Sequence, residues 1–404
     1  MGTKHTVQKR IAKHLSGPFY GKQFTGLLII DAQNKDTLFK HNAQKYFIPA
    51  SNTKIFTLYT ALKLLPKNLP IIRYIEKRDT LYFEGMGNPV TLHPHFRDST
   101  LVHFLRSKEN VAFYPHNFHD VPLGPGWAWD DYQWYYSTER SGLPLYGNVL
   151  TVYGPKGTVH PTYFTDSIQW KEHPEYRLQQ KNRFHIPPKV TDTLEIPFKT
   201  EIPTTRNLFE AALQKPVPIV DYFPRDDAKI LYGTATDSVL VRMMLQSDNF
   251  LSEQLLIMAS AVLSDSLNTH RAIDYMLEGP LQTLRQPPRW VDGSGLSRYN
   301  LFSPESMVHV LSQLYAEIPR ERLFPYFPIG GKSGTLEDWY AGNPEPYVYA
   351  KTGSLGNNHN LSGYLLTQSG KTLIFSFMNN HFRSDSKEVK RKMQRILEFV
   401  RDSY

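Results

Sequence analysis

Strand-like and helix-like patterns occupy both ends of this 404-residue chain, and a middle part of different character separates them. Residues 26–31 and 37–41 are apolar runs joined by a short polar turn, which is typical of a β-hairpin. Near the other end, apolar runs at 347–351, 360–367 and 371–379 predict further strands. We therefore expect one α/β domain that is built from both ends of the chain and interrupted by an insertion.

Helical spacing of apolar residues accompanies these strands. It predicts helices over residues 5–16, 55–65, 236–260, 267–287, 386–400 and directly after Ser303. The middle part is rich in Tyr, His and Pro and contains short strand-like pieces, so we interpret residues 76–231 as a β-rich accessory region with room for two small subdomains. The aromatic clusters at 127–129 and 134–136 are expected in its core. Residues 1–75 and 232–404 then form the discontinuous main domain.

Composition excludes several classes of function. The chain has no cysteine, so disulfides, thiol nucleophiles and Cys-based metal sites are ruled out. The histidines do not form a HExxH motif, so we expect ordinary surface or packing histidines and not a metal site. A formal net charge of +8 suits an anionic partner, but no Lys/Arg run is long enough to predict nucleic-acid binding. No apolar stretch of about 18 residues predicts a transmembrane segment.

Short motifs that carry chemistry occur in order along the chain. Ser51-Asn-Thr-Lys54 stands at an expected helix start, where residues three apart share one face. A Lys54 amine kept neutral by burial or nearby cations can take the proton of Ser51. Ser247-Asp-Asn249 combines a hydroxyl that can relay a proton with an amide that can hold a substrate carbonyl.

The last motif, Lys351-Thr352-Gly353-Ser354, lies at the end of an expected strand. Lys351 and Thr352 can hold a substrate carboxylate by charge-assisted hydrogen bonds. Gly353 lets a substrate lie along the strand edge, and a backbone N–H after it can share an oxyanion hole with that of Ser51. Each motif alone has an ordinary alternative, such as an N-cap serine, a turn or a solvated lysine, but their order is hard to obtain by chance.

This trio is shared by class A β-lactamases and penicillin-binding proteins. Further segments extend the likeness: Gly85–Pro89, with Asn88 in place of the usual Asp, Ser247–Leu256, Asp292–Arg298 and Gly330–Leu336. The chain resembles a class C low-molecular-mass penicillin-binding protein, a family of serine D-Ala-D-Ala carboxypeptidases with endopeptidase activity. The resemblance implies an α/β (α+β) penicillin-binding/β-lactamase-type fold, in which an antiparallel sheet has helices on both faces.

The resemblance also implies acyl transfer on peptidoglycan stem peptides. Ser51 would attack the carbonyl between two D-alanines with Lys54 as base, while Ser247 passes the proton to the leaving amine. Asn249 would position the substrate, and a β-lactam would acylate the same serine. Water would then release the acyl-enzyme, so no cofactor is needed.

Substrate binding is implied at the third motif. Lys351 and Thr352 would hold the terminal carboxylate, and the backbone amides of Ser51 and Ser354 would form the oxyanion hole. Asp131 lies in a segment similar to the family's Trp-x-Trp-Asp/Asn-Asp, whose acidic residue holds the third residue of the stem peptide. The alternative for Asp131 is a plain turn or N-cap aspartate.

Two other functions are open at this point. One is a serine β-lactamase or esterase on the same catalytic domain, although a class A β-lactamase places its second motif much closer to the first. The other is a non-catalytic wall-binding protein. A cell-wall substrate implies a periplasmic location, and since the first residues lack an apolar core, we expect that an export signal has been removed from this sequence.

Overall fold

The computed structural model describes residues 3–404, and the chain divides into two compact units. Unit 1 consists of Met1–Tyr59, Leu240–Asp248 and Ile273–Tyr404, and unit 2 of Thr60–Val239 and Asn249–Ala272. The expected insertion, 76–231, lies within unit 2, which also takes in 60–75, 232–239 and 249–272. Helices α2 (Lys54–Leu64), α5 (Thr236–Leu245) and α7 (Thr269–Glu278) each contribute residues to both units.

Unit 1 is built on a five-stranded antiparallel sheet with the strand order β12-β13-β14-β1-β2. Its strands are β1 (Phe24–Asp31), β2 (Thr37–His41), β12 (Val348–Leu355), β13 (Asn358–Leu366) and β14 (Thr372–Asn380). The inner strands β1, β13 and β14 are buried along almost their whole length. Strands that are apolar on both sides need a cover on each face of the sheet.

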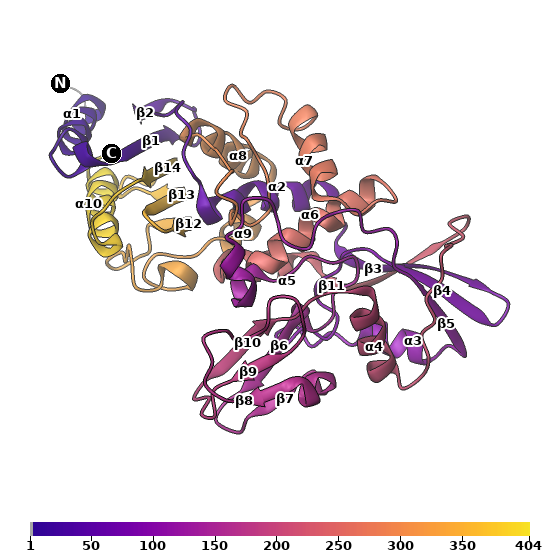
Figure 1. The fold of residues 1–404 in the computed structure, drawn as a ribbon. Helices are drawn as coiled ribbons and strands as arrows, with labels where there is room; N and C mark the ends of the chain where they lie inside the picture. Colours follow the sequence, from indigo (N-terminus) through magenta and orange to yellow (C-terminus); the bar gives the residue numbers. More distant parts are fainter. Residues whose placement is uncertain (1–2) are drawn as a thin grey trace. The chain divides into compact units, whose positions relative to one another are not determined.

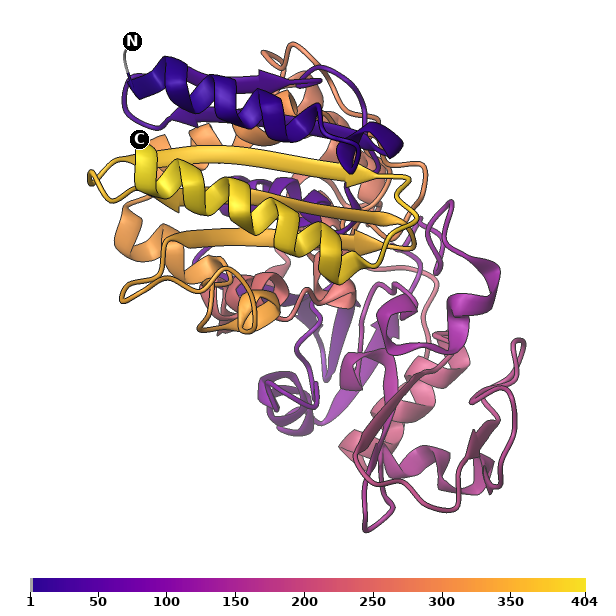
Figure 2. The same ribbon diagram turned by 90° about the vertical axis from the view of Figure 1, so that its left-hand side faces the viewer.

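Helices supply that cover. They are α1 (Thr3–Leu15), α8 (Pro304–Glu317) and α10 (Ser386–Ser403), and the short α9 (Arg320–Leu323) follows α8. Figure 2 shows α1 and α10 side by side across one face of the sheet, and α8 packs against β1 and β14 on the other (Figure 1). On the first face, Ile396 and Leu397 of α10 join Phe375 and Phe377 of β14 in one apolar core. This arrangement confirms the predicted α/β fold with an antiparallel sheet between helices.

Unit 2 contains smaller sheets and one helix, α6 (Asn249–Leu263), that is buried from Phe250 to Ala261. A four-stranded sheet has the order β11-β3-β4-β5, with β4 and β5 parallel, beside a three-stranded sheet β10-β6-β7 and the pair β8-β9. The strands are β3 (Asn68–Lys77), β4 (Thr80–Gly85), β5 (Asn110–Tyr114), β6 (Val149–Tyr153), β7 (Thr158–His160), β8 (Ile168–Trp170), β9 (Phe184–Ile186), β10 (Thr193–Pro197) and β11 (Lys229–Ala235). The helices are α3 (Thr100–Arg106), α4 (Ile202–Leu213) and α6 (Asn249–Leu263). Phe83 and Phe113 stack in the core at 5.2 Å between ring centroids.

Three expected elements differ from the structure. The helix predicted over 236–260 is two helices, because Ser247 adopts a left-handed φ of +57° between α5 and α6. The helix predicted over 267–287 ends at Glu278, where Gly279 and Pro280 stop it. The aromatic clusters are not core: Trp129 is 76% and Tyr135 63% exposed, since their short 3-10 helices, η3 (Trp129–Gln133) and η4 (Tyr135–Ser137), lie at the surface.

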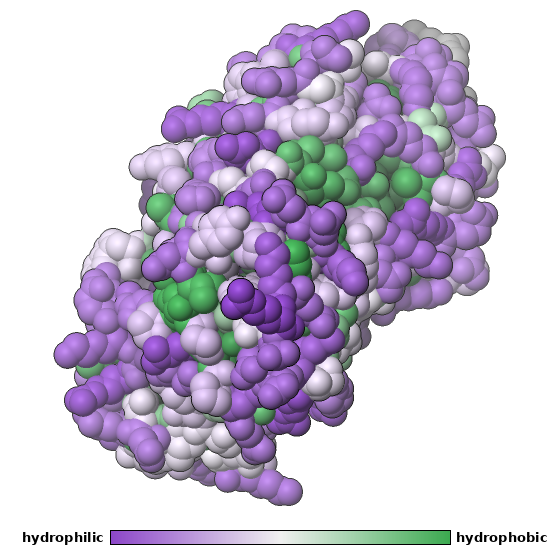
Figure 3. All heavy atoms as spheres, turned by 90° about the vertical axis from the view of Figure 1, so that its right-hand side faces the viewer, coloured by the Kyte–Doolittle hydropathy of each residue, from purple (hydrophilic) through white to green (hydrophobic). Residues whose placement is uncertain are grey.

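The surface carries no large apolar band on the face drawn in Figure 3, where hydrophobic residues form small groups between hydrophilic ones. Within residues 3–404, none of the helices has both the length and the apolar character needed to cross a lipid bilayer.

Candidate active site

Ser51 lies in η2 (Ala50–Thr53), a 3-10 turn that leads directly into α2. The preceding residue, Ala50, has a left-handed φ of +48°, a conformation that costs a non-glycine residue about 1 kcal/mol or more. Two asparagines of the sheet hold this turn. Asn360 Nδ2 donates to Pro49 O at 2.9 Å, and the backbone N–H of Ile48 donates to Asn380 Oδ1 at 2.7 Å. The nucleophile candidate is therefore fixed to the sheet by side chains that the motifs do not include.

Lys54 begins α2 and is fully buried. Its Nζ donates to Ser51 Oγ at 3.0 Å and to the carbonyl of Ser294 at 2.8 Å. The residues three apart thus meet on one face of the helix, as the spacing predicts. A serine hydroxyl within hydrogen-bond reach of a buried amine is the arrangement that nucleophile activation needs.

The carbonyl of Ser294, which accepts from Lys54, belongs to a loop that is held by hydrogen bonds to Asp292. Asp292 is fully buried. The Asp292 carboxylate accepts from the backbone N–H of Gly295 at 2.8 Å and of Ser297 at 2.6 Å, and from Asn300 Nδ2 at 2.7 Å. Gly295 has a φ of +82°, and a Cβ there would lie 1.9 Å from the carbonyl oxygen of Ala50. The glycine lets this loop approach the turn that carries Ser51.

Lys351 and Ser247 meet in unit 1. Lys351 Nζ donates to Ser247 Oγ at 2.9 Å and to the carbonyl of Thr352 at 2.9 Å. Burial lowers the pKa of Lys351 well below its ordinary value, and the charge of Lys54 lowers this pKa further. The two lysines and the two serines of the motifs therefore form one linked cluster.

Strand β12 presents the third motif directly beside η2. Asn52 Nδ2 donates to the carbonyl of Lys351 at 3.0 Å, and a Cβ at Gly353 would lie 2.3 Å from the carbonyl oxygen of Pro49. Only glycine fits this approach. Next to it, the hydroxyl of Thr352 donates to the hydroxyl of Thr335 at 2.7 Å. Ser354 is exposed, and its Oγ lies 2.8 Å from Nδ1 of His359.

Asn249 and Asp131 belong to unit 2, and Tyr136 connects them. Asn249, the first residue of α6, donates from Nδ2 to the carbonyl of Tyr136 at 2.8 Å. The hydroxyl of Tyr136 donates to Asp131 Oδ1 at 2.8 Å. Burial and the bond to Asp131 raise the pKa of Tyr136, so its phenol keeps the proton that it donates.

Several of these residues have no signal in the motifs. Asp292, Ser294 and Thr335 lie in glycine-containing segments that resemble the family, but the segments did not reveal which side chain or carbonyl would be used. Tyr136 lies in an aromatic cluster that was expected in the core. Among residues 3–404, no group of three or more His, Asp or Glu side chains is placed to hold a metal ion.

A family model matches residues 7–176 and 236–400, which is more than half of the chain. The chain belongs to the D-Ala-D-Ala carboxypeptidase 3 (S13) family. Both matched ranges include residues described above, from Ser51 and Asp131 in the first to Ser247 and Lys351 in the second. The unmatched stretch between them lies within unit 2.

Curated relatives match over shorter segments. The D-alanyl-D-alanine carboxypeptidase DacB of Haemophilus influenzae is 34% identical over 116 residues, which cover 28% of this chain and 24% of that protein. The penicillin-sensitive carboxypeptidase A of Dictyostelium discoideum is 30% identical over 160 residues, which cover 36% of this chain and 30% of that protein. The chain thus spans less than a third of the length of these relatives.

Solved structures share the fold over nearly the whole chain. Penicillin binding protein 4 of Haemophilus influenzae superposes with a TM-score of 0.74 at 18% identity, covering 99% of this chain and 98% of that one. The same protein in complex with a β-lactam gives a TM-score of 0.68 at 16% identity, covering 99% and 98%. At these identities the match establishes the fold of the S13 chain.

Proposed function

We propose that this S13 chain is a serine DD-peptidase that cleaves D-Ala-D-Ala bonds of peptidoglycan stem peptides through an acyl-enzyme on Ser51. The observation that carries the proposal is the 3.0 Å hydrogen bond between buried Lys54 Nζ and Ser51 Oγ. The family membership and the peptidase relatives support the substrate class. Endopeptidase action on D-Ala cross-links and an extracytoplasmic, periplasmic location belong to the same proposal.

The first step is attack on the substrate carbonyl. Lys54 Nζ takes the proton of Ser51 Oγ as that oxygen bonds to the carbonyl carbon, and the amine then carries the positive charge. The Ser294 carbonyl, 2.8 Å from Lys54 Nζ, stabilises the ammonium that forms. The backbone N–H groups of Ser51 and Ser354 are the proposed donors to the oxyanion, and the start of α2 favours negative charge there.

The second step delivers a proton to the leaving D-Ala amine. Ser247 Oγ is bonded to Lys351 Nζ, so the serine can give up its proton to the amine and recover one from the lysine. Asn249 is the proposed anchor for a peptide carbonyl of the substrate. Water then attacks the Ser51 ester and regenerates the free hydroxyl.

Lys351 and Thr352 are the proposed holders of the terminal carboxylate, and Gly353 leaves room for the substrate along β12. A carboxylate beside Lys351 favours its charged form, which opposes the lowering of its pKa by burial. Asp131 is the proposed partner for the third residue of the stem peptide. Its carboxylate suits a side-chain amine at that residue.

The proposal is tested by following the mass of the intact protein with benzylpenicillin and the release of D-Ala from a stem pentapeptide. We expect a long-lived adduct of one penicillin, and we expect Ser51→Ala to lose both the adduct and D-Ala release. Rapid turnover of penicillin would favour a β-lactamase instead. Retained D-Ala release in Ser51→Ala would reject the nucleophile, and wild-type protein that releases none would favour a non-catalytic wall-binding protein.

A further inference from the structure

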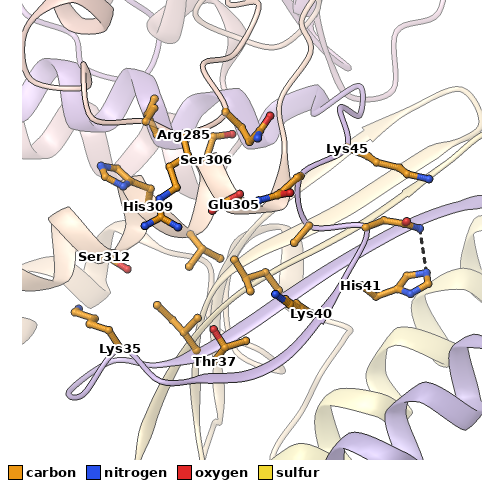
Figure 4. A pocket seen from close by; sticks show the side chains of 18 of the residues that line it. Lys35, Thr37, Lys40, His41, Lys45, Arg285, Glu305, Ser306, His309 and Ser312 are labelled. Carbon is orange, nitrogen blue, oxygen red and sulfur yellow. Dashed lines mark hydrogen bonds between the residues drawn. The ribbon is translucent and has the colours of Figure 1, made fainter.

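A cavity of about 1050 Å³ lies between the β1–β2 hairpin and α8 in unit 1. Figure 4 shows Lys35, Thr37 and Lys40 on the hairpin side, facing Glu305 and His309 of α8. Ordinary ligand cavities measure roughly 300–1,000 Å³, so this one can take a ligand of several rings. None of the residues of the three motifs lines it.

The charge of the lining points to an anionic ligand. Lys35, Lys40, Lys45 and Arg285 line the cavity, and Glu305 is the one carboxylate among its lining residues. Within the described residues 3–404, the side-chain nitrogens of Lys40, Lys45 and Arg285 form neither a hydrogen bond nor an ion pair. A concave surface with several unpaired cations concentrates anions from solution.

A second observation points to hydrogen-bond donors on the same ligand. Glu305 Oε2 and His309 Nε2 are buried, and among the described residues neither has a hydrogen-bond partner. An unpaired buried carboxylate oxygen is costly, so a ligand that brings an O–H or N–H to Glu305 gains from it. The amides at the start of α8 are already used. That of Glu305 donates to the carbonyl of Ala43, and that of Ser306 donates to Ser303 Oγ.

We propose that this cavity binds an acidic saccharide, a carboxylated or phosphorylated sugar unit. Its anionic group lies among Lys40, Lys45 and Arg285, and its hydroxyl groups donate to Glu305. A bare anion is repelled by Glu305 and leaves it unpaired. A neutral sugar leaves the cations unpaired. A purely cationic ligand is repelled, because the cavity is lined by more cationic side chains than carboxylates. A ligand that combines negative charge with hydroxyl groups satisfies both sets of side chains.

Binding is measured by calorimetry on the full chain with Ser51→Ala, which keeps the result separate from catalysis. The probes are trigalacturonic acid, glucose 6-phosphate, inorganic sulfate as a charge without a sugar or an O–H donor, and chitotriose as a sugar without a charge. We expect at least one of the two acidic saccharides to bind more tightly than both sulfate and chitotriose, and the tighter one identifies the anionic group.

Variants locate the site. Lys40→Ala/Lys45→Ala is expected to weaken binding of the acidic saccharide about tenfold or more, because charge-assisted hydrogen bonds are lost. The matched control, Lys387→Ala/Arg391→Ala, removes the same charge from exposed positions of α10 and is expected to change affinity less than about twofold. Glu305→Gln is expected to weaken binding of the saccharide but not of sulfate, because the carboxylate accepts from hydroxyl groups and repels an anion that has none.

Equal affinities for sulfate and both saccharides, or equal losses in the cavity and control variants, would overturn the proposal. Folding is checked by benzylpenicillin acylation of Lys40→Ala/Lys45→Ala in the Ser51 protein, which we expect to be unchanged because neither lysine belongs to the motifs. If that variant is not acylated, Arg285→Ala replaces it. A wild-type chain that binds the saccharide but takes no penicillin would leave this site standing while rejecting the proposed peptidase.

Discussion

The environment of Lys351 strongly constrains the protonation state of its amine. It is fully buried, it donates to Ser247 and Thr352, and burial together with Lys54 holds its pKa well below the ordinary value of 10.5. In the proposed role, a substrate carboxylate restores the charge of this lysine. Binding of a carboxylate is then coupled to uptake of a proton.

The first prediction follows from this coupling. As pH rises through the lowered pKa of free Lys351, benzylpenicillin should acylate Ser51 more slowly, by up to about tenfold for each pH unit, because the ligand selects the protonated lysine. The measurement is the acylation rate constant between neutral pH and 10.5, the ordinary pKa of lysine. The control is a depsipeptide substrate compared with its C-terminal amide, which lacks the carboxylate. Parallel alkaline losses for acid and amide would contradict the role of Lys351.

The second prediction concerns Tyr136, which holds Asp131 with its hydroxyl and Asn249 with its backbone carbonyl. Tyr136→Phe removes only the first contact. We expect KM to rise about tenfold for a stem peptide with an amine at its third residue, since a hydrogen bond to a carboxylate is worth about 1.5–3 kcal/mol. The kcat should change little, and a peptide with a neutral third residue should be unaffected. A fall in kcat for both peptides would assign Tyr136 a structural role instead.

At the scale of elements, the site depends on how closely β12 lies against η2. Gly353 makes this possible, because a Cβ there would lie 2.3 Å from the carbonyl of Pro49 and 2.8 Å from Asn52 Nδ2. The third prediction is that Gly353→Ala moves the strand away from Ser51, with a loss of about 1–3 kcal/mol in unfolding free energy and about 10²-fold in acylation rate.

The matched control for Gly353→Ala is Gly356→Ala, in the turn after β12, where a Cβ would have no atom within 4 Å. Urea unfolding and penicillin acylation of both variants check the prediction. Similar effects in the two variants would mean that general perturbation of β12, and not contact with η2, controls the site.

Elements with a strong periodic pattern could be predicted from the sequence. The β1–β2 hairpin, the last three strands, α2 and the proline-started α8 all lie where their patterns placed them. The break between α5 and α6 could not be predicted, because Ser247 takes a left-handed φ that apolar spacing does not record. The exposure of the aromatic residues within 127–136 could not be predicted either, because hydrophobic character alone does not say whether a short 3-10 turn is covered.

At the scale of the whole molecule, the two ends of the chain form one sheet. This could be predicted because both ends have strand patterns and the middle part of the chain has a different composition. The pairing of β1 with β14 shows this closure directly. The spacing in the first motif predicts the contact between Ser51 and Lys54, and the other two motifs include Ser247 and Lys351. The residues that hold the site in place, however, come from distant parts of the sequence. Asn360, Asn380 and Asp292 act through contacts with loops far away in sequence, and single-sequence patterns contain no such information.

The charged residues that give the net charge of +8 are unevenly distributed over the structure. Helix α1 has four Lys/Arg residues and no Asp or Glu, while the adjacent α10 has six Lys/Arg against three acidic residues. Both helices lie on one face of the sheet (Figure 2). Such a face attracts an anionic polymer over about a Debye length, roughly 10 Å at 0.1 M salt and 3 Å at 1 M.

We therefore expect binding of the protein to isolated anionic cell wall to fall several-fold between about 0.1 and 1 M salt, as screening shortens the reach of this face. Lys9→Gln/Lys13→Gln, at exposed positions of α1, should weaken low-salt binding more than Lys171→Gln/Lys181→Gln, which removes the same charge from exposed positions of unit 2. A sedimentation assay at both salt concentrations measures this. Binding that is independent of salt, or equally weakened by both pairs, would show that the uneven charge of α1 and α10 does not direct the protein to the wall.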